Sequence, residues 1–503
     1  LTMSTKTKNI LAILVLGTTS SGCNSEQSPI EEFNVIYILA DDLGYGDLGC
    51  YGQTKIETPN IDRLATEGML FTHHYAGSSV SAPSRSVLMT GLHTGHTPIR
   101  ANRGGVGRGD NSEGQTPLPA NTYTLGRMFQ QSGYITGAFG KWGLGSPGSE
   151  GDPTLQGFDE FFGYNCQALA HKYYQEYLWH NRDTVWLTGN NLVQRVQYAP
   201  DIIHQQALGF IRDNASKKFF AFLPYILPHA ELMPPEDDLM KKYRGQFEET
   251  PYSRGEKAGD YTPLKKSRVG YCSQPEPHAA FAATVSRLDK YVGDVLALVD
   301  SLGIREHTII IFASDNGPHR EGGGDPNFFA SNGPFRGYKR DLYEGGLRVP
   351  MIASCPGFIP ANSQSNHIST FWDVLPTFAE LLGTRVPLET DGISMLPTLL
   401  DRGQQKEHDY LYWEFHEDGG KAAVRMGDWK GVLLGVIDNP EAKIELYNLA
   451  TDIHENYNVA DEYPEIVSQI TKIMHMTHTP SPIFHFGWMD EKHDVSGVNS
   501  SKH

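Results

Sequence analysis

Carboxylates and an amide stand at the ends of two apolar segments of this sequence. Asp41 and Asp42 follow residues 34–40, and Asp315 and Asn316 follow the strand-like run that ends at Ala313. Oxygen donors of this kind suit calcium or magnesium and not zinc. An Asp-Asp pair after a strand is more often a helix cap or a turn. The metal-site interpretation therefore depends on whether the fold brings the two pairs together.

Apolar periodicity predicts the elements that would position these acids. The strands predicted before residue 400 are 34–40, 134–139, 219–225, 308–313 and 349–354, and the predicted helices are 59–71, 121–133, 200–214, 278–302 and 370–382. Their alternation predicts an α/β fold, in which a parallel or mixed sheet is covered by helices on both faces. Because ligands bind beyond the carboxyl ends of strands in such sheets, one site can gather Asp41, Asp42 and Asp315.

The pattern changes after about residue 405. Short strands are predicted at 410–415, 422–426, 429–434 and 444–449, and a helix is predicted at 464–474. This order predicts a smaller antiparallel sheet with a helix packed on it. We therefore expect a domain that carries the site over residues 33–404, a C-terminal α+β subdomain over 405–490 and a polar tail over 491–503.

The first residues have the layout of a signal peptide. Two lysines precede an apolar run over residues 10–16, which is too short to span a membrane, and small residues follow. Gly22-Cys23 resembles the end of a bacterial lipobox, in which the Cys is lipidated. We therefore predict a signal peptide over residues 1–23, a lipid anchor at Cys23 and a tether over 24–32, with plain cleavage as the alternative. The predicted location is the periplasm or the outer membrane of a Gram-negative bacterium.

Length and charge restrict the class of partner. The chain has 503 residues and a formal net charge of -17. That length allows two domains and a large core. The acidic balance argues against nucleic acid as a partner, which would require a basic face. An anion site needs only a few local cations, so the total charge does not exclude an anionic substrate.

The run from Ser81 to Gly91, Ser-Ala-Pro-Ser-Arg-Ser-Val-Leu-Met-Thr-Gly, resembles the signature of the type I sulfatases. In that family the first residue, Cys or Ser, is oxidised to formylglycine, whose hydrate attacks sulfur and later expels sulfate. The resemblance implies this modification at Ser81, and a Ser-type sulfatase-maturing radical enzyme as a partner. Pro83 would lie in the first turn of a helix, which would place Ser81 at the positive end of the helix dipole.

Residues 140–145 resemble the family's Gly-Lys-Trp-His-Leu-Gly segment, in which the Lys binds sulfate and the formylglycine. The resemblance puts that role on Lys141, and Arg85 matches the signature Arg that steadies the formylglycine. One position departs from the family pattern, because its usual His is Gly143 here. That His commonly accepts the diol proton when sulfate is expelled, so the base for the last step has no assignment.

Two later segments resemble sulfate-binding segments of the family. Residues 227–230 match its Pro-His segment, so His229 would contact sulfate and protonate the leaving oxygen, a task that suits a reference pKa near 6.5. Residues 336–339 match its R-G-x-K segment, which makes Lys339 the second sulfate-binding Lys. The resemblance also implies one calcium ion, with magnesium as the alternative. Its ligands would be Asp41, Asp42, Ser81, Asp315 and Asn316.

The substrate side is expected among histidines and aromatic residues. A His-rich, aromatic stretch over residues 168–180 includes His171, and His319 and Arg320 lie just past the second acid pair. Aromatic rings stack on sugars, and His or Arg can contact hydroxyls or carboxylates. We therefore expect His171, His319 and Arg320 to bind substrate, with a structural role for the histidines as the alternative. With Gly143, the stretch looks like bacterial sulfatases that act on sulfated galactose-type sugars.

The resemblance covers about residues 33–480 and implies an alkaline-phosphatase-like fold, in which helices flank a central mixed sheet beside a smaller C-terminal α+β subdomain. It implies S–O cleavage of a carbohydrate sulfate monoester, exo-acting on a galactose or N-acetylgalactosamine-type sugar. One alternative is a phosphomonoester or phosphonate hydrolase of the same superfamily. Asp315 and His319 have the D-x-x-x-H spacing of one zinc site of those phosphatases, but the Asp-His pair of the second is absent. The other alternative is a catalytically inactive sugar-binding lipoprotein.

Overall fold

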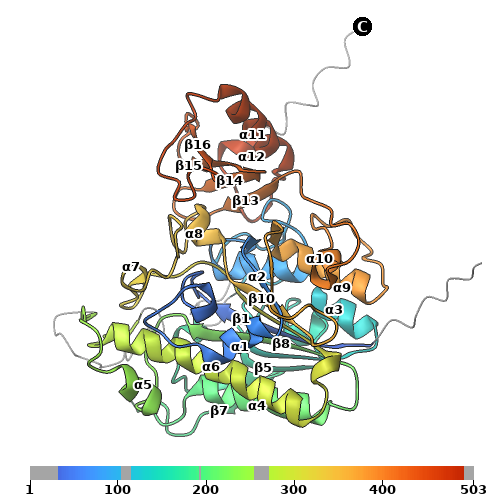
Figure 1. Cartoon of the computed structure of the whole chain (residues 1–503), viewed down its shortest axis with the longest axis vertical. Coiled ribbons are helices and arrows are strands. Elements are labelled where there is room, and N and C mark those ends of the chain that lie inside the picture. Colours follow the sequence, from blue (N-terminus) through green and yellow to red (C-terminus); the bar gives the residue numbers. More distant parts are fainter. Residues whose placement is uncertain (1–31, 103–114, 192–193, 254–270, 492–503) are drawn as a thin grey trace, which may run out of the picture. The chain divides into compact units, whose positions relative to one another are not determined.

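The computed structural model describes residues 32–102, 115–191, 194–253 and 271–491 (Figure 1). The predicted signal peptide, the anchor at Cys23 and the tether up to residue 31 lie outside the described residues, as does the predicted tail from residue 492. Within the described ranges, no helix has both the length and the apolar character that a membrane span needs.

A ten-stranded mixed sheet forms the centre of the fold, with the strand order β11-β2-β10-β9-β1-β8-β4-β5-β6-β7. The five strands from β9 to β5 are parallel to one another, whereas β10 and β6 run antiparallel to their inner neighbours. The strands of this sheet are β1 (Asn34–Asp41), β2 (Met69–Phe71), β4 (Ile135–Lys141), β5 (Glu160–Tyr164), β6 (Tyr177–His180), β7 (Asp183–Trp186), β8 (Phe219–Pro228), β9 (Thr308–Ser314), β10 (Met351–Ser354) and β11 (Ser363–Ser365). A separate two-stranded sheet pairs β3 (His74–Tyr75) with β12 (Ser369–Thr370).

Helices cover both faces of the large sheet (Figure 1). One face packs against α2, α3 and α9, and the other against α1, α4 and α6. The helices of the described residues are α1 (Pro59–Thr66), α2 (Ser81–Thr90), α3 (Leu125–Gln131), α4 (Ala199–Asp213), α5 (Asp238–Tyr243), α6 (Pro277–Ser301), α7 (Pro326–Phe329), α8 (Glu344–Leu347), α9 (Val374–Leu381), α10 (Leu396–Leu400), α11 (Pro464–Thr477) and α12 (Trp488–Glu491).

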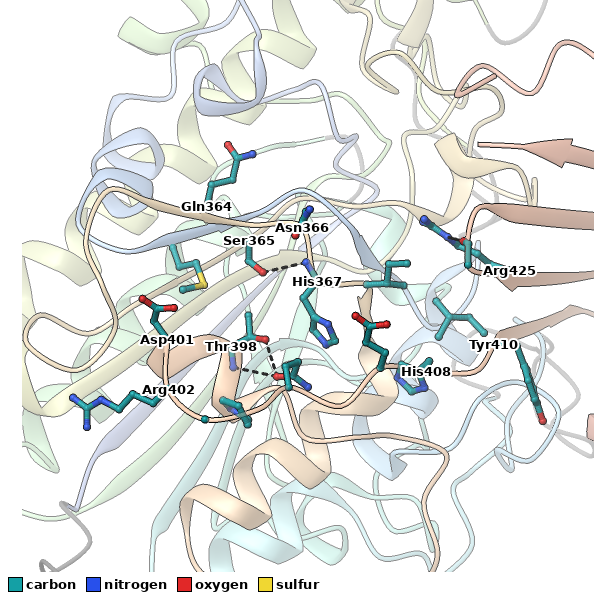
Figure 2. Close-up of a pocket in the computed structure, with 18 residues that line it drawn as sticks. Gln364, Ser365, Asn366, His367, Thr398, Asp401, Arg402, His408, Tyr410 and Arg425 are labelled. Carbon is teal, nitrogen blue, oxygen red and sulfur yellow. Dashed lines mark hydrogen bonds between the residues drawn. The ribbon is translucent and has the colours of Figure 1, made fainter. Parts of the chain in front are cut away.

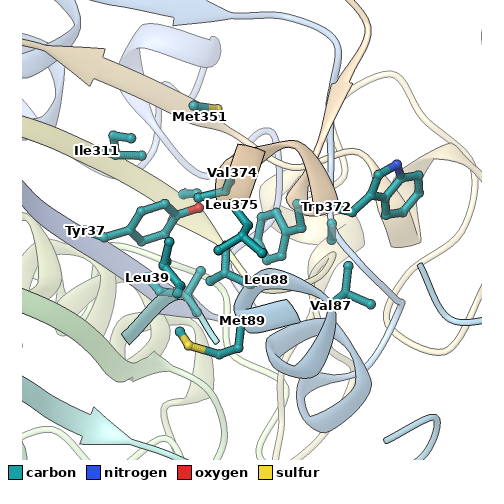
Figure 3. Packing of buried hydrophobic residues seen from close by; sticks show 14 of the residues in the cluster. Tyr37, Leu39, Val87, Leu88, Met89, Ile311, Met351, Trp372, Val374 and Leu375 are labelled. Carbon is teal, nitrogen blue, oxygen red and sulfur yellow. The ribbon is translucent and has the colours of Figure 1, made fainter. Parts of the chain in front are cut away.

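The sequence of β1 explains why both faces are covered. Val35, Tyr37 and Leu39 belong to the apolar cluster on the α2 face, whereas Ile36 and Ile38 belong to the cluster on the α6 face. Successive side chains of a strand point to opposite faces, so a continuously apolar strand needs apolar partners on both. Figure 3 shows the α2 side of this packing, and the same packing holds the start of α2 at the carboxyl edge of the sheet.

The predicted α/β class with a mixed, helix-flanked sheet is confirmed, although several element ends differ. The helix predicted at 59–71 ends at Thr66, because residues 69–71 pair with β10 as β2. The helix predicted at 121–133 begins at Leu125, because the Thr124 hydroxyl caps it by accepting a hydrogen bond from the Arg127 N–H at 3.2 Å.

A second, antiparallel sheet follows in the order β13-β14-β15-β16. Its strands are β13 (Leu411–Phe415), β14 (Lys421–Met426), β15 (Trp429–Leu434) and β16 (Ile444–Asn448). Ile470 and Met474 of α11 pack with Val424 and Leu446 in its core. The predicted antiparallel sheet with a helix packed on it is therefore confirmed, and the domain boundary at residues 404/405 stays a prediction.

Candidate active site

The two predicted acid pairs meet at the carboxyl edge of the large sheet. Strands β1 and β9 are parallel neighbours, so the residues that follow them emerge side by side. The Asp42 N–H donates a hydrogen bond to Asp315 Oδ1 at 3.1 Å. Asp41, Asp42, Asp315 and Asn316 are all buried. Asp42 has a φ of 63°, in the left-handed region that residues other than Gly seldom adopt outside functional sites.

The donor set fits a hard divalent cation. Asn316 Oδ1 is buried and has no hydrogen-bond partner among the described residues, whereas its Nδ2 donates to Asp42 Oδ1 at 2.7 Å. Potential ligand atoms of Asp41, Asp42 and His229 lie within 4.8 Å of one another. A cation bound by these oxygens would supply the partner that the Asn316 carbonyl lacks.

Ser81 is the first residue of α2, as the position of Pro83 predicts. Only 1% of its surface is exposed, and its Oγ donates a hydrogen bond to Asp41 Oδ1 at 2.9 Å. The side chain at position 81 thus lies between the positive end of a helix dipole and the acid cluster. That location favours negative charge developing on an atom at position 81.

Arg85 lies one turn further along α2 and is also buried. Its Nε and Nη2 donate to Asp315 Oδ2 at 3.0 and 2.9 Å, and its Nη1 donates to the Lys141 carbonyl at 2.6 Å. The guanidinium therefore fixes both a predicted metal ligand and the end of β4. Arg85 therefore positions these two groups. The planar guanidinium is suited to this, because it can donate several hydrogen bonds at once in a fixed geometry.

Two lysines complete the cationic side of the site. Lys141 Nζ donates to Asp41 Oδ2 at 2.7 Å, and Lys339 Nζ donates to Asp42 Oδ2 at 2.8 Å and to Glu321 Oε2 at 3.0 Å. Burial alone would lower the pKa of Lys339, but Asp42 and Glu321 raise it above its ordinary value. Lys339 is therefore charged at every relevant pH.

His229 directly follows β8 and faces Lys339. Its Nε2 lies 3.2 Å from Lys339 Nζ and 3.4 Å from Asp42 Oδ2, and its Nδ1 contacts the Ala230 carbonyl. The Nδ1 contact assigns the proton to Nδ1, which leaves Nε2 as an acceptor. Burial and the Lys339 charge lower the pKa of His229 to about 4. Without a bound anion this ring is therefore neutral.

The pKa values of the acids in the cluster are shifted in opposite directions. Burial and the neighbouring Asp41 carboxylate raise the pKa of Asp315 to about 6. Burial would also raise the pKa of Asp41, but Lys141, His229 and Arg85 together hold it well below its usual value. The three aspartates face three cations, Arg85, Lys141 and Lys339. The charges of these three acids and three cations cancel, so a bound divalent cation would make the site net positive. A net positive site would attract an anionic group.

The three predicted substrate-binding residues lie in different surroundings. His171 stacks on His229, with ring centroids 5.2 Å apart and an interplanar angle of 12°. His319 is buried, its Nε2 lies 3.3 Å from the Pro228 carbonyl and its Nδ1 accepts the Glu321 N–H at 3.1 Å. Arg320 is exposed and covers the Tyr338 ring at 3.7 Å. His171 and His319 thus both lie beside His229, the His319 ring at a centroid distance of 6.0 Å, and internal contacts engage both ring nitrogens of His319.

Glu321 and Tyr271 belong to the site but carry no sequence signal. Glu321 contacts Lys339, as noted above, and Arg340, and it accepts a hydrogen bond from the Tyr271 hydroxyl at 2.7 Å. The Tyr271 ring lies 5.5 Å from that of His171.

A cavity of about 530 Å³ lies elsewhere, beside β11 and the segment between α10 and β13 (Figure 2). Its lining includes His367, Arg402, His408, Tyr410 and Arg425, and none of the predicted site residues. This cavity therefore does not mark the acid cluster.

Comparisons with known proteins agree with this geometry. A family model described as Sulfatase matches residues 33–384, and one described as N-sulphoglucosamine sulphohydrolase, C-terminal, matches residues 334–479. N-acetylgalactosamine-6-sulfatase of Mus musculus is 29% identical over 95% of this chain and 83% of its own length. N-acetylgalactosamine-6-O-sulfatase of Bacteroides thetaiotaomicron is 28% identical over 91% of this chain and 96% of its own length.

The solved structures include a similar fold with a bound oligosaccharide. The crystal structure of Ps i-CgsB in complex with k-i-k-neocarrahexaose has a TM-score of 0.72 and 26% identity. The match covers 93% of this chain and 98% of that chain.

Proposed function

This chain belongs to the sulfatase family and is a sulfuric ester hydrolase, and from that premise we propose that its substrate is a sulfate monoester of a carbohydrate. The observation that carries the proposal is the position of Ser81. Its Oγ lies 2.9 Å from Asp41 Oδ1 at the start of α2. The same Asp41 carboxylate contacts two buried cations, Arg85 and Lys141, which suit an anionic substrate and not a neutral one.

The proposed substrate is a sulfated galactose or N-acetylgalactosamine-type sugar at a chain end. Two similar proteins are named as N-acetylgalactosamine-6-sulfatases, and a similar solved structure holds neocarrahexaose. In this chain the His171 ring lies beside the rings of both His229 and Tyr271. We propose that a sugar stacks against this group of rings.

The modification proposed at Ser81 is formylglycine, which when present supplies the hydrated aldehyde that attacks sulfur. The chain's own groups then act around it. Lys141 and Lys339 bind sulfuryl oxygens and stabilise their charge. Arg85 binds Asp315 and the Lys141 carbonyl. It thereby fixes the position of residue 81 relative to the proposed metal ligands.

The metal proposed for this site is calcium, held by the oxygens of Asp41, Asp42, Asp315 and Asn316 and by the side chain at position 81. Bound there, it would withdraw electron density from a sulfuryl oxygen. Four oxygen donors with the unpaired Asn316 carbonyl support calcium or magnesium over zinc. His229 is the group proposed to protonate the leaving oxygen from Nε2, after a bound sulfate anion raises the pKa of the ring and Nε2 takes up a proton from solvent.

The test is sulfate release from mono- and disaccharides sulfated at O2, O3, O4 or O6. The protein would be co-expressed with a Ser-type maturing enzyme and assayed with calcium or with a chelator. We expect release from one regioisomer, only with calcium, and none from Ser81→Ala.

Intact mass would confirm conversion at residue 81 in the same sample. No release by converted protein from any sugar of the panel would count against the carbohydrate proposal. Release of phosphate from matched sugar phosphates would instead support a phosphomonoester hydrolase.

The proposed location is the periplasm or the outer membrane, with a lipid anchor at Cys23. This proposal rests on the sequence pattern of residues 1–23 alone. Labelling with a radioactive fatty acid in wild type and Cys23→Ala would test it.

A further inference from the structure

The position where this chain departs from the sulfatase signature is filled by a side chain from the turn that follows β5. Gly143 has a φ of +73°, and a Cβ placed on it would lie 2.3 Å from Nε2 of Gln167. The Gln167 amide therefore occupies the space that a side chain at position 143 would enter. Gly143 lies two residues after Lys141, at the same edge of the sheet as the acid cluster.

Asn165 accompanies Gln167 in this place. Asn165 follows β5, the neighbour of β4, and its carbonyl accepts the Gly143 N–H at 3.1 Å. The Gln167 N–H donates to Gln115 Oε1 at 3.3 Å. One backbone contact thus holds Asn165 against Gly143 and another holds Gln167 to Gln115, and neither contact uses the side-chain amide of Asn165 or Gln167.

Three atoms of these two amides lack a hydrogen-bond partner among the described residues. Asn165 is 0% exposed, and both its Oδ1 and its Nδ2 lack a hydrogen-bond partner. Nε2 of Gln167 is also buried without a partner. In the described ranges, Asn165 is the one residue with two such atoms.

Unpaired buried amides cost stability and contribute nothing to folding. A leucine of similar size would pack at position 165 at lower cost. Polar groups retained against this cost are expected where a ligand pairs with them. The ligand of this edge is anionic, because Lys141 and Lys339 lie beside the adjoining acids.

We propose that the amides of Asn165 and Gln167, which lie beside Gly143, bind sulfuryl oxygens of the substrate and of product sulfate. The inference rests on the proposed function and names two further substrate-binding residues of the same site. Amide N–H groups donate to sulfate oxygens without carrying a charge or a titratable proton. Binding by this pair is therefore independent of pH across the working range.

The competing interpretation is that ordered water satisfies both amides and that they bind no ligand. The two interpretations differ in stability as well as in binding. Under the ligand-binding inference, Asn165→Leu removes an unpaired amide from the free protein, so its Tm rises by about 1–3 °C. If water satisfied the amide, the same change would lower the Tm or leave it unaltered.

The experiment measures inorganic sulfate binding by calorimetry in calcium buffer, with the full chain carrying unconverted Ser81. We expect Asn165→Leu and Gln167→Ala each to weaken the sulfate Kd at least fivefold. The matched control is Asn190→Leu. Asn190 is a buried amide whose Nδ2 donates to the Gln175 and Gln197 carbonyls, both at 2.8 Å, so its loss should lower the Tm and leave the sulfate Kd unchanged.

Each outcome is decisive. Sulfate affinity within twofold of wild type in both variants would overturn the inference alone. A wild-type protein that does not bind sulfate would contradict the inference together with the proposed sulfate site. Weakened sulfate binding in the variants, with no hydrolysis of any sugar by converted wild type, would support the inference and reject the proposed carbohydrate class.

Discussion

Arg85 and Asp315 are joined by two hydrogen bonds to one oxygen, because Nε and Nη2 of Arg85 donate to Asp315 Oδ2 at 3.0 and 2.9 Å. Both side chains are buried. The second oxygen of Asp315 accepts the Asp42 N–H. The pair thus links α2 to both acid pairs, so that position 81 and the proposed metal ligands are held through the same side chains.

Removal of Arg85 should damage stability and activity together. Arg85→Ala leaves the Asp315 carboxylate buried without its main donor, and we expect a loss of about 3–5 kcal/mol in the free energy of unfolding. Sulfate release should fall at least about 100-fold. Urea unfolding and initial rates would measure both. Arg63→Ala removes an exposed Arg that pairs with Asp300 at 2.9 Å, and it should change stability by about 1 kcal/mol or less.

Calcium should stabilise the folded protein through the unpaired Asn316 carbonyl. A ligand at 100 times its Kd contributes about 2.7 kcal/mol, so the Tm should rise when calcium replaces chelator. Asn316→Ala should lose most of this rise. Thermal unfolding with calcium, magnesium and chelator would measure it. An equal rise in wild type and Asn316→Ala would exclude Asn316 as a ligand.

Glu455 should make stability fall as pH increases. Burial raises the pKa of Glu455 to about 7, and the nearby Lys430 only partly offsets this. A raised carboxyl pKa means that the protonated form is favoured in the folded state. Its stabilising contribution is complete below about pH 4.5, the ordinary value, and is lost as pH rises through about 7.

Glu455→Gln imitates the protonated form and should flatten this part of the pH profile. Between pH 5 and pH 8.5, wild type should lose about 1–3 kcal/mol relative to the variant. Urea unfolding at several pH values would show the difference. Glu441→Gln, at an exposed position, should run parallel to wild type. Parallel curves for Glu455→Gln would mean that Glu455 does not titrate in this range.

His171 and Arg320 should differ in their effect on substrate binding. His171 stacks on His229, so His171→Ala should lower kcat/KM at least about tenfold by loosening the His229 ring, the proposed acid for the leaving oxygen. Arg320 is exposed over Tyr338, and Arg320→Ala should change kcat/KM less than about threefold. Steady-state kinetics on the hydrolysed sugar would compare them, and a larger loss in Arg320→Ala would reverse this assignment.

The sequence predicts those parts of the site that depend on local pattern. Apolar runs ending in Asp41 and Asp315 correctly locate two strands, and parallel pairing then brings the acids together. The start of α2 at Ser81 is likewise predictable, because Pro83 favours a first helical turn. These features follow from a few consecutive residues.

Other parts of the site depend on contacts between distant segments. Glu321 is a site residue because its carboxylate meets Lys339 and Tyr271, and no spacing in the sequence indicates that contact. The Asn165 and Gln167 amides can be recognised as candidate ligands only in the folded structure, which places them beside Gly143. The substrate-binding role of His319 stays a prediction: its ring lies 6.0 Å from that of His229, and Pro228 and Glu321 contact its two nitrogens.

The burial of Ser81 limits the stage of synthesis and folding at which this residue can be modified. At 1% exposure beneath Asp41, its hydroxyl cannot enter the active site of another enzyme once α2 has packed. Any enzyme that oxidises this residue must therefore meet it on an unfolded chain. Protein synthesis supplies that interval, because residue 81 is made well before Asp315, which binds Arg85, and before Lys339, which binds Asp42.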